Sequence, residues 1–96
     1  MYQDVATVTR PGAAVSASVY LRCPGTVACP ATLAVWGLGM TDQEIIAKNV
    51  VVPAGGQWIP VSVGGSFARQ HDVQRVEVYN GAIARNLDVD QMTHVG

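Results

Sequence analysis

The stretch "AAVSASVYLRC", residues 13–23, alternates apolar and polar side chains at every second position. One side carries Ala13, Val15, Ala17, Val19 and Leu21, and the other carries Ser16, Ser18, Tyr20 and Arg22. Successive side chains of a β-strand point to opposite faces of the sheet. The stretch therefore predicts a strand with one face in the core and the other in solvent.

The same period-2 pattern recurs along the chain, and no window of a dozen residues shows a helical stripe. The other expected strands are residues 2–8, 31–39, 45–52, 57–63, 73–80 and 85–95. About seven short strands separated by Pro-Gly, Gly-Gly and Asn-Gly turns are typical of an antiparallel β-sandwich. Only "TDQEIIAKN" allows a helical turn, with Thr41 as its cap and Glu44 three residues later. The β-branched residues that follow Glu44 favour a strand. Pro60 cannot donate a ladder hydrogen bond, which predicts an edge position for its strand or an outward-facing amide at that point.

Composition limits the function classes. The chain has 96 residues, which we read as one domain over 1–96, with 49% hydrophobic and 14% charged residues and a net charge of −1. A near-zero charge without basic clusters argues against nucleic-acid binding. No apolar run reaches the roughly 18 residues of a membrane helix, so we expect no membrane partner. No basic segment followed by an apolar one opens the chain, so we expect any secretory signal to have been removed or never to have belonged to this sequence.

Two cysteines, Cys23 and Cys29, enclose "PGTVA". A zinc site needs four ligands, and neither histidine lies near this pair in sequence. A disulfide that closes a tight loop is favoured and would add about 2 kcal/mol to stability. It would indicate an oxidising compartment, so an extracellular or secreted protein. The alternative is a pair of reduced, buried thiols.

Five segments in order carry a resemblance: "YQDV", "RPGAAVSASVYLRC", "VVPAGGQWIPVSVGGSF", "RVEVYNG" and "NLDVDQM". Together they resemble jelly-roll carbohydrate-binding modules of the galactose-binding-like type, over nearly the whole chain. The resemblance implies an all-β, antiparallel, jelly-roll-like sandwich and a non-catalytic role. The strands around an "N..FE....W" segment that usually open such modules have no counterpart here, so either the chain is a fragment or a shortened sandwich covers the exposed edge in another way. Asp90 matches a closing aspartate that often binds calcium, but its usual partners are missing, so we expect no metal.

Both tryptophans are candidates for sugar stacking. Trp58 lies on the face opposite Ile59, Val61 and Val63, and packing in the core or at the sheet edge is favoured over a ligand contact. Trp36 is the better ligand candidate, because it shares a face with neither Leu33 nor Val35. The alternative is that Trp36 packs with Leu38 in a second apolar layer.

Five further side chains are expected on outward faces: Tyr20, Arg22, Arg75, Glu77 and Tyr79. The family arrangement implies that their strands are neighbours in one sheet. There the aromatic rings would stack on sugar faces while the charged groups bond hydroxyls. The alternative for Arg75 and Glu77 is an ordinary solvated cross-strand contact.

No residue pattern supports catalysis. His71 is expected in a polar "RQHD" loop beside Asp72, and no activated serine or cysteine accompanies it. His94 has no evident partner, and Asp88 with Asp90 lacks the cleft that a glycosidase needs. We therefore expect no enzyme and no cofactor.

Two hypotheses of function follow. The first is a carbohydrate-binding module that uses one sheet face. The alternative is an assembly subunit, a homo-oligomer whose shortened sandwich is completed by strand pairing with neighbouring chains, because exposed strand edges template such pairing.

Overall fold

A computed structural model describes residues 1–82 and 86–96. It contains seven strands and, in these residues, no helix. The strands are β1 (Tyr2–Thr9), β2 (Ala14–Arg22), β3 (Cys29–Leu38), β4 (Glu44–Val52), β5 (Ile59–Ser66), β6 (His71–Asn80) and β7 (Asp88–Val95). The expected strand at residues 85–95 begins at Asp88, and Arg85 lies outside the described residues. The helical turn considered at Thr41 is absent, because Glu44 begins β4.

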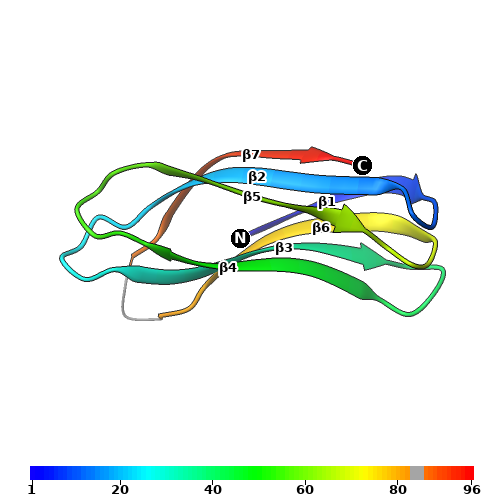
Figure 1. Ribbon diagram of the computed structural model, residues 1–96, viewed down its shortest axis with the longest axis horizontal. Coiled ribbons are helices and arrows are strands. Elements are labelled where there is room, and N and C mark those ends of the chain that lie inside the picture. Colours follow the sequence, from blue (N-terminus) through cyan, green and yellow to red (C-terminus); the bar gives the residue numbers. More distant parts are fainter. Residues whose placement is uncertain (83–85) are drawn as a thin grey trace.

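The strands form two antiparallel sheets that pack as a β-sandwich (Figure 1). The four-stranded sheet has the order β1-β6-β3-β4, and the three-stranded sheet has the order β5-β2-β7. All strands run along the long axis of a molecule measuring 43 × 20 × 17 Å. The all-β sandwich expected from the alternation is confirmed, and Pro60 lies on β5, an edge strand as expected.

The core lies between the two sheets and is built from the inward positions of the alternating stretches. On β2, Val15, Val19 and Leu21 are almost completely buried, while Tyr20 between them is exposed. The largest fully buried apolar side chains are Phe67, Leu21, Leu33, Val19, Val35, Val52 and Val76. Burial of each such side chain contributes about 1.5–3 kcal/mol relative to exposure.

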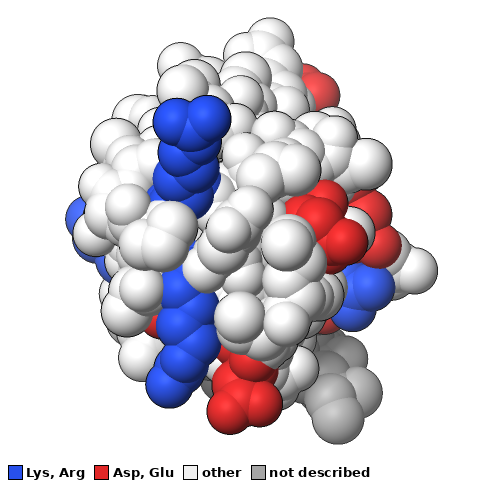
Figure 2. All heavy atoms as spheres, turned by 90° about the vertical axis from the view of Figure 1, so that its right-hand side faces the viewer, with Lys and Arg blue, Asp and Glu red and all other residues white. Residues whose placement is uncertain are grey.

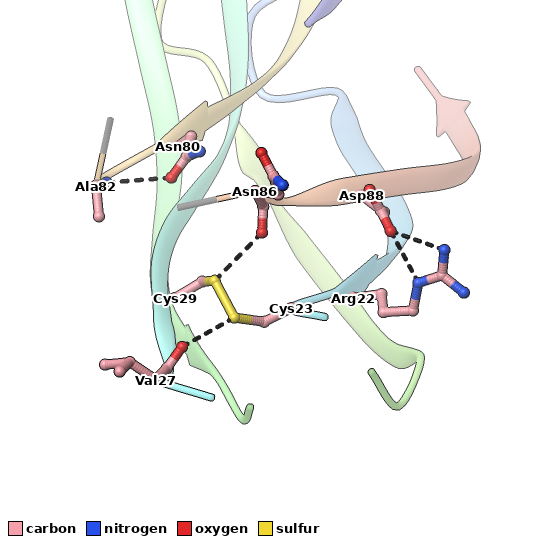
Figure 3. Close-up of a disulfide and its surroundings, with 8 residues drawn as sticks. All are labelled: Arg22, Cys23, Val27, Cys29, Asn80, Ala82, Asn86 and Asp88. Atoms are coloured by element: carbon pink, nitrogen blue, oxygen red, sulfur yellow. Dashed lines mark hydrogen bonds and ion pairs between the residues drawn. A yellow bond between two sulfur atoms is a disulfide. The ribbon is translucent and has the colours of Figure 1, made fainter. Parts of the chain in front are cut away.

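One disulfide joins the two sheets (Figure 3). Cys23 directly follows β2 and Cys29 begins β3, so the bond crosses from the three-stranded sheet to the four-stranded one. The Cα atoms are 5.9 Å apart, and both residues are at most 1% exposed. The carbonyl oxygen of Val27 in the enclosed loop lies 3.2 Å from Cys23 Sγ. The disulfide expected from the sequence is confirmed.

His71 does not lie in a polar loop, so that expectation is wrong. It is the first residue of β6 and fully buried, with its ring edge against Phe67. Its Nε2 is 2.6 Å from Glu44 Oε2, and its Nδ1 is 3.2 Å from the Gly39 carbonyl oxygen. Both neighbours are hydrogen-bond acceptors, so the imidazole ring lies between two oxygen atoms to which a ring N–H can donate.

Glu44 also fastens the turn between β5 and β6. Its two carboxylate oxygens accept the backbone N–H groups of Ala68 and Arg69, each at 2.9 Å. The hydrogen bond from His71, helped by these amides, holds the pKa of Glu44 below its ordinary value against the opposing effect of desolvation. The first residue of β4 therefore connects three segments at one end of the sandwich.

Candidate functional site

The six candidate residues divide between the two outer faces. Trp36 of β3 lies on the outer face of the four-stranded sheet, together with three residues of β6: Arg75, Glu77 and Tyr79. Tyr20 and Arg22 lie on the outer face of the three-stranded sheet, because β2 pairs with β5 and β7. The expectation that β2 and β6 are neighbours in one sheet is wrong, so the six residues cannot form one surface.

A hydrogen-bonded chain connects three of the residues on the four-stranded sheet. Trp36 Nε1–H donates to the Tyr79 hydroxyl at 3.0 Å, and that hydroxyl donates to Glu77 Oε1 at 2.7 Å. Partial burial raises the pKa of Tyr79, and the hydrogen bond to the Glu77 carboxylate raises it further. The hydroxyl therefore stays protonated and holds the indole and the phenol in one arrangement.

Ala34 lies beneath this chain. It pairs with Glu77, between the row of Trp36 with Arg75 and the row of Thr32 with Tyr79. Although Ala34 faces outward, it is completely buried, because the larger side chains around it close over its methyl group. A longer side chain here would push the indole away from the sheet. We call Trp36, Tyr79, Glu77 and the underlying Ala34 the Trp36 platform.

The charges beside the Trp36 platform compensate one another. Arg75 donates to Asp4 of β1 through two bonds, Nε to Oδ1 at 2.7 Å and Nη2 to Oδ2 at 3.1 Å. Its guanidinium also lies 4.5 Å from the ring centre of Tyr2. The pair lowers the pKa of Asp4 and raises the pKa of Arg75, chiefly through their hydrogen bond. Arg75 is therefore engaged with β1 and is less available to a ligand than its sequence position predicts.

A shallow groove of about 270 Å³ continues the Trp36 platform toward β4. Its outward-facing residues are Pro30, Thr32, Asn49 and Val51. Thr32 Oγ1 donates to Asn49 Oδ1 at 2.7 Å, which leaves the Asn49 amide NH₂ directed away from this bond. Thr32 also pairs with Tyr79 in the β3–β6 register, so groove and platform are adjacent.

Thr32 and Asn49 were not among the site residues predicted from the sequence. The signal that identifies them is that they pair directly across the β3–β4 hairpin. It depends on the hairpin register, which is fixed only once the connection near Gly39 and Met40, both with positive φ, is known.

The opposite outer face carries the other aromatic cluster. The Arg22 guanidinium lies 4.5 Å from the ring centre of Trp58 and also bonds Asp88, with Nη2 to Oδ2 at 2.7 Å (Figure 3). Trp58 is 37% exposed, so it packs at the sheet edge and not in the core. Arg22 already stacks on one face of this indole, whereas Tyr20 is more open at 42% exposed.

The histidines and carboxylates form no metal-binding cluster in residues 1–82 and 86–96. No group of three or more His, Cys, Asp or Glu side chains converges there. His94 does have a partner, contrary to expectation: its Nε2 bonds the Gln74 side chain, whose amide in turn bonds Thr9. Burial lowers the pKa of His94, which favours its neutral form.

Comparison with known proteins gave no match. No protein-family model fits the chain, and no curated protein or solved structure is significantly similar to it. No helix of the described part of the chain is long and apolar enough to cross a membrane. A disulfide in a small β domain is compatible with an extracellular location.

Proposed function

We propose that this protein is a non-catalytic, extracellular carbohydrate-binding module that holds its ligand on the outer face of the four-stranded sheet. The observation that carries the proposal is the Trp36 platform. Tyr79 and Glu77 hold the indole in one orientation, so little side-chain entropy is lost when a ligand binds to this aromatic surface. The apolar face of a pyranose ring fits such a surface, while its hydroxyls need polar groups at the rim.

The polar groups for those hydroxyls come from residues beside the indole. Glu77 has a second carboxylate oxygen beyond the one that accepts from Tyr79. Asn49 lines the adjoining groove and has an amide NH₂ besides the oxygen that accepts from Thr32. Arg75 is compensated by Asp4. Charge elsewhere is sparse: Figure 2 shows scattered charged side chains and no broad patch of one sign on the end that it views. An uncharged glycan is the ligand class that this chemistry favours.

The strand order supports a jelly-roll type of sandwich. A jelly roll has eight strands in two Greek keys. If its first strand is left out and the others are renumbered, the two sheets have the orders 1-6-3-4 and 5-2-7, as found here. The sequence resemblance to jelly-roll carbohydrate-binding modules points the same way.

The test is a glycan-array screen followed by titration calorimetry of Trp36→Ala against its matched control, Trp58→Ala. We expect Trp36→Ala to weaken binding about 5- to 30-fold, a loss of about 1–2 kcal/mol for an aromatic contact. Trp58→Ala, on the other sheet, should change affinity less than about twofold. Tyr79→Phe keeps the ring but frees the indole, and we expect an intermediate loss. Equal effects of the two tryptophan variants, or no glycan bound, would rule the proposal out.

The second candidate function is assembly in which a single strand from a neighbouring chain completes the sandwich. The observation that favours it is the outer edge of β7, which pairs with no strand of the described residues.

A further inference from the structure

The two sheets are unequal in width, and β1 extends past the smaller one. β4 packs against β5, and β3 against β5 and β2. The bond between His94 of β7 and Gln74 of β6 places β7 over β6. Since β1 is the next strand after β6, no strand of the described residues lies over it.

Exposure along β1 confirms this overhang. The inward positions of β6, Val76 and Val78, are almost completely buried. Their partners on the inward face of β1 are not: Gln3 opposite Val76 is exposed, and Met1 beside Val78 is 66% exposed. Val5, further along the same face, is only partly buried. The inward face of β1 thus lines an open position that an inward-facing strand would cover.

The edge of β7 forms the second wall of this open position. β7 pairs with β2 on one side, and its other side carries backbone N–H and C=O groups without a strand partner in the described residues. Its inward-facing Val89 and Met92 pack on the core but stay partly exposed. We call the space between the β7 edge and the inward face of β1 the β1–β7 slot.

We propose that the β1–β7 slot accepts one extended segment of another polypeptide, added as a fourth strand beside β7. Strand addition of this kind draws affinity from main-chain hydrogen bonds and specificity from alternate side chains. One side of the added strand would cover Val5, Val89 and Met92, and the other would continue the outer face of the three-stranded sheet.

The overhang of β1 determines whether the β1–β7 slot can accept a single extended segment or a second copy of this protein. If a copy brought its own β7 alongside this β7, its β6 would lie beneath its β7, in the space that β1 occupies. A rigid second sandwich is therefore blocked, whereas a single strand fits between β7 and β1. The β-bulge at Gln91, with φ of 52°, divides the edge into two short pairing regions.

The residues of the slot specify the chemistry of the segment. Alternate residues must be apolar to contact Val5, Val89 and Met92. On the outward-facing side of β7, Asp90 is exposed, and among the described residues its carboxylate accepts only the backbone N–H of Gln91. This free negative charge favours a lysine or arginine at the opposite position of the added strand. A segment as long as β7, which has 8 residues, would span the edge.

The experiment is a two-dimensional amide NMR titration of the protein with the synthetic peptide KVTVKVTV. The control peptide KTVVKTVV has the same composition without the alternation. Two further peptides carry N-methyl groups on alternate residues of KVTVKVTV, one blocking each hydrogen-bonding edge. We expect shifts confined to β7 and β1 with KVTVKVTV and with one N-methylated peptide, and none with the other two.

Variants test the walls of the slot. Val5→Lys places a charge in it and should weaken peptide binding about tenfold or more. Val8→Lys is the matched control on the same strand, because Val8 is already 61% exposed, and it should leave binding within about twofold. Asp90→Lys should weaken binding of the lysine-containing peptide about two- to fivefold. Thermal melts of each variant check that it folds.

Shifts on β4 or β5 in place of β7, equal binding of both N-methylated peptides, or no shift up to the solubility limit would overturn the proposal. A dimer of the protein with protected β7 amides would also overturn it, because the occupant would then be a second copy. The outcome is separable from glycan binding, since Trp36→Ala should leave the peptide titration unchanged.

Discussion

Reduction of the Cys23–Cys29 disulfide should lower the stability of the sandwich substantially. The bond closes a loop with a sequence separation of 6, which in the chain-entropy model corresponds to about 2 kcal/mol. For a domain of this size, such a loss lowers the melting temperature by about 8–16 °C. The effect acts between the sheets, because one cysteine follows β2 and the other begins β3.

The assay is thermal denaturation, followed by circular dichroism, of oxidised protein and of protein reduced in denaturant and refolded with reductant present. Unfolding before reduction is needed because both cysteines are at most 1% exposed. The double variant Cys23→Ala/Cys29→Ala should have the melting temperature of the reduced protein, and adding reductant should not change it. A difference below about 3 °C between oxidised and reduced protein would refute the reasoning and show that packing alone holds the sheets in register.

Three other changes test the buried polar contacts and one close approach. Glu44→Gln should lower the melting temperature at neutral pH. The difference in melting temperature from the wild type should shrink as the pH falls through the lowered pKa of Glu44, because the wild-type carboxylate is then protonated. Burial lowers the pKa of His94 below its ordinary value of 6.5, so the unfolded chain takes up this proton first and stability should fall as the pH drops below 6.5. His94→Gln should reduce the dependence of the melting temperature on pH between pH 7 and 5. Gly37→Ala should cost about 1–3 kcal/mol in urea denaturation, because its Cβ would lie 2.5 Å from His71 Cδ2, whereas Gly25→Ala meets no atom within 4 Å.

Each of these has a contrary result. A pH-independent gap for Glu44→Gln would mean that its bonds to the turn, not its charge, carry the effect. An unchanged pH slope in His94→Gln would place the acid sensitivity elsewhere. Equal stability of the two glycine variants would show that the β6 backbone adjusts around the added methyl group.

The strands could be predicted from the sequence because alternation is a local property. The stretch at residues 13–23 needed only its own pattern to reveal a half-buried strand. The division of strands between sheets is not local: β2 pairs with β7 and β6 with β1, over separations that no short window contains. For that reason Tyr20 and Arg22 were placed beside Tyr79 and lie on the opposite face.

The buried polar pairs were missed for a related reason. His71 stands among polar neighbours in "RQHD", which is typical of a surface loop, and its burial depends on Glu44, placed 27 residues earlier. A polar side chain can enter a core when its partner satisfies it, and only the fold shows that partner. The Trp36 platform was half predicted: Trp36, Tyr79 and Glu77 were chosen as outward residues, but not their mutual hydrogen bonds.

The pairing of β1 with β6 and of β2 with β7 also sets the order of events on the ribosome. Tyr2 pairs with Glu77, and Ser16 pairs with Val95, so neither of the first two strands acquires all its neighbours until most of the chain has been synthesised. Folds dominated by such distant pairings form in milliseconds to seconds, more slowly than proteins rich in local contacts. During that interval the unpaired edges of the nascent strands are exposed to mispairing with other chains.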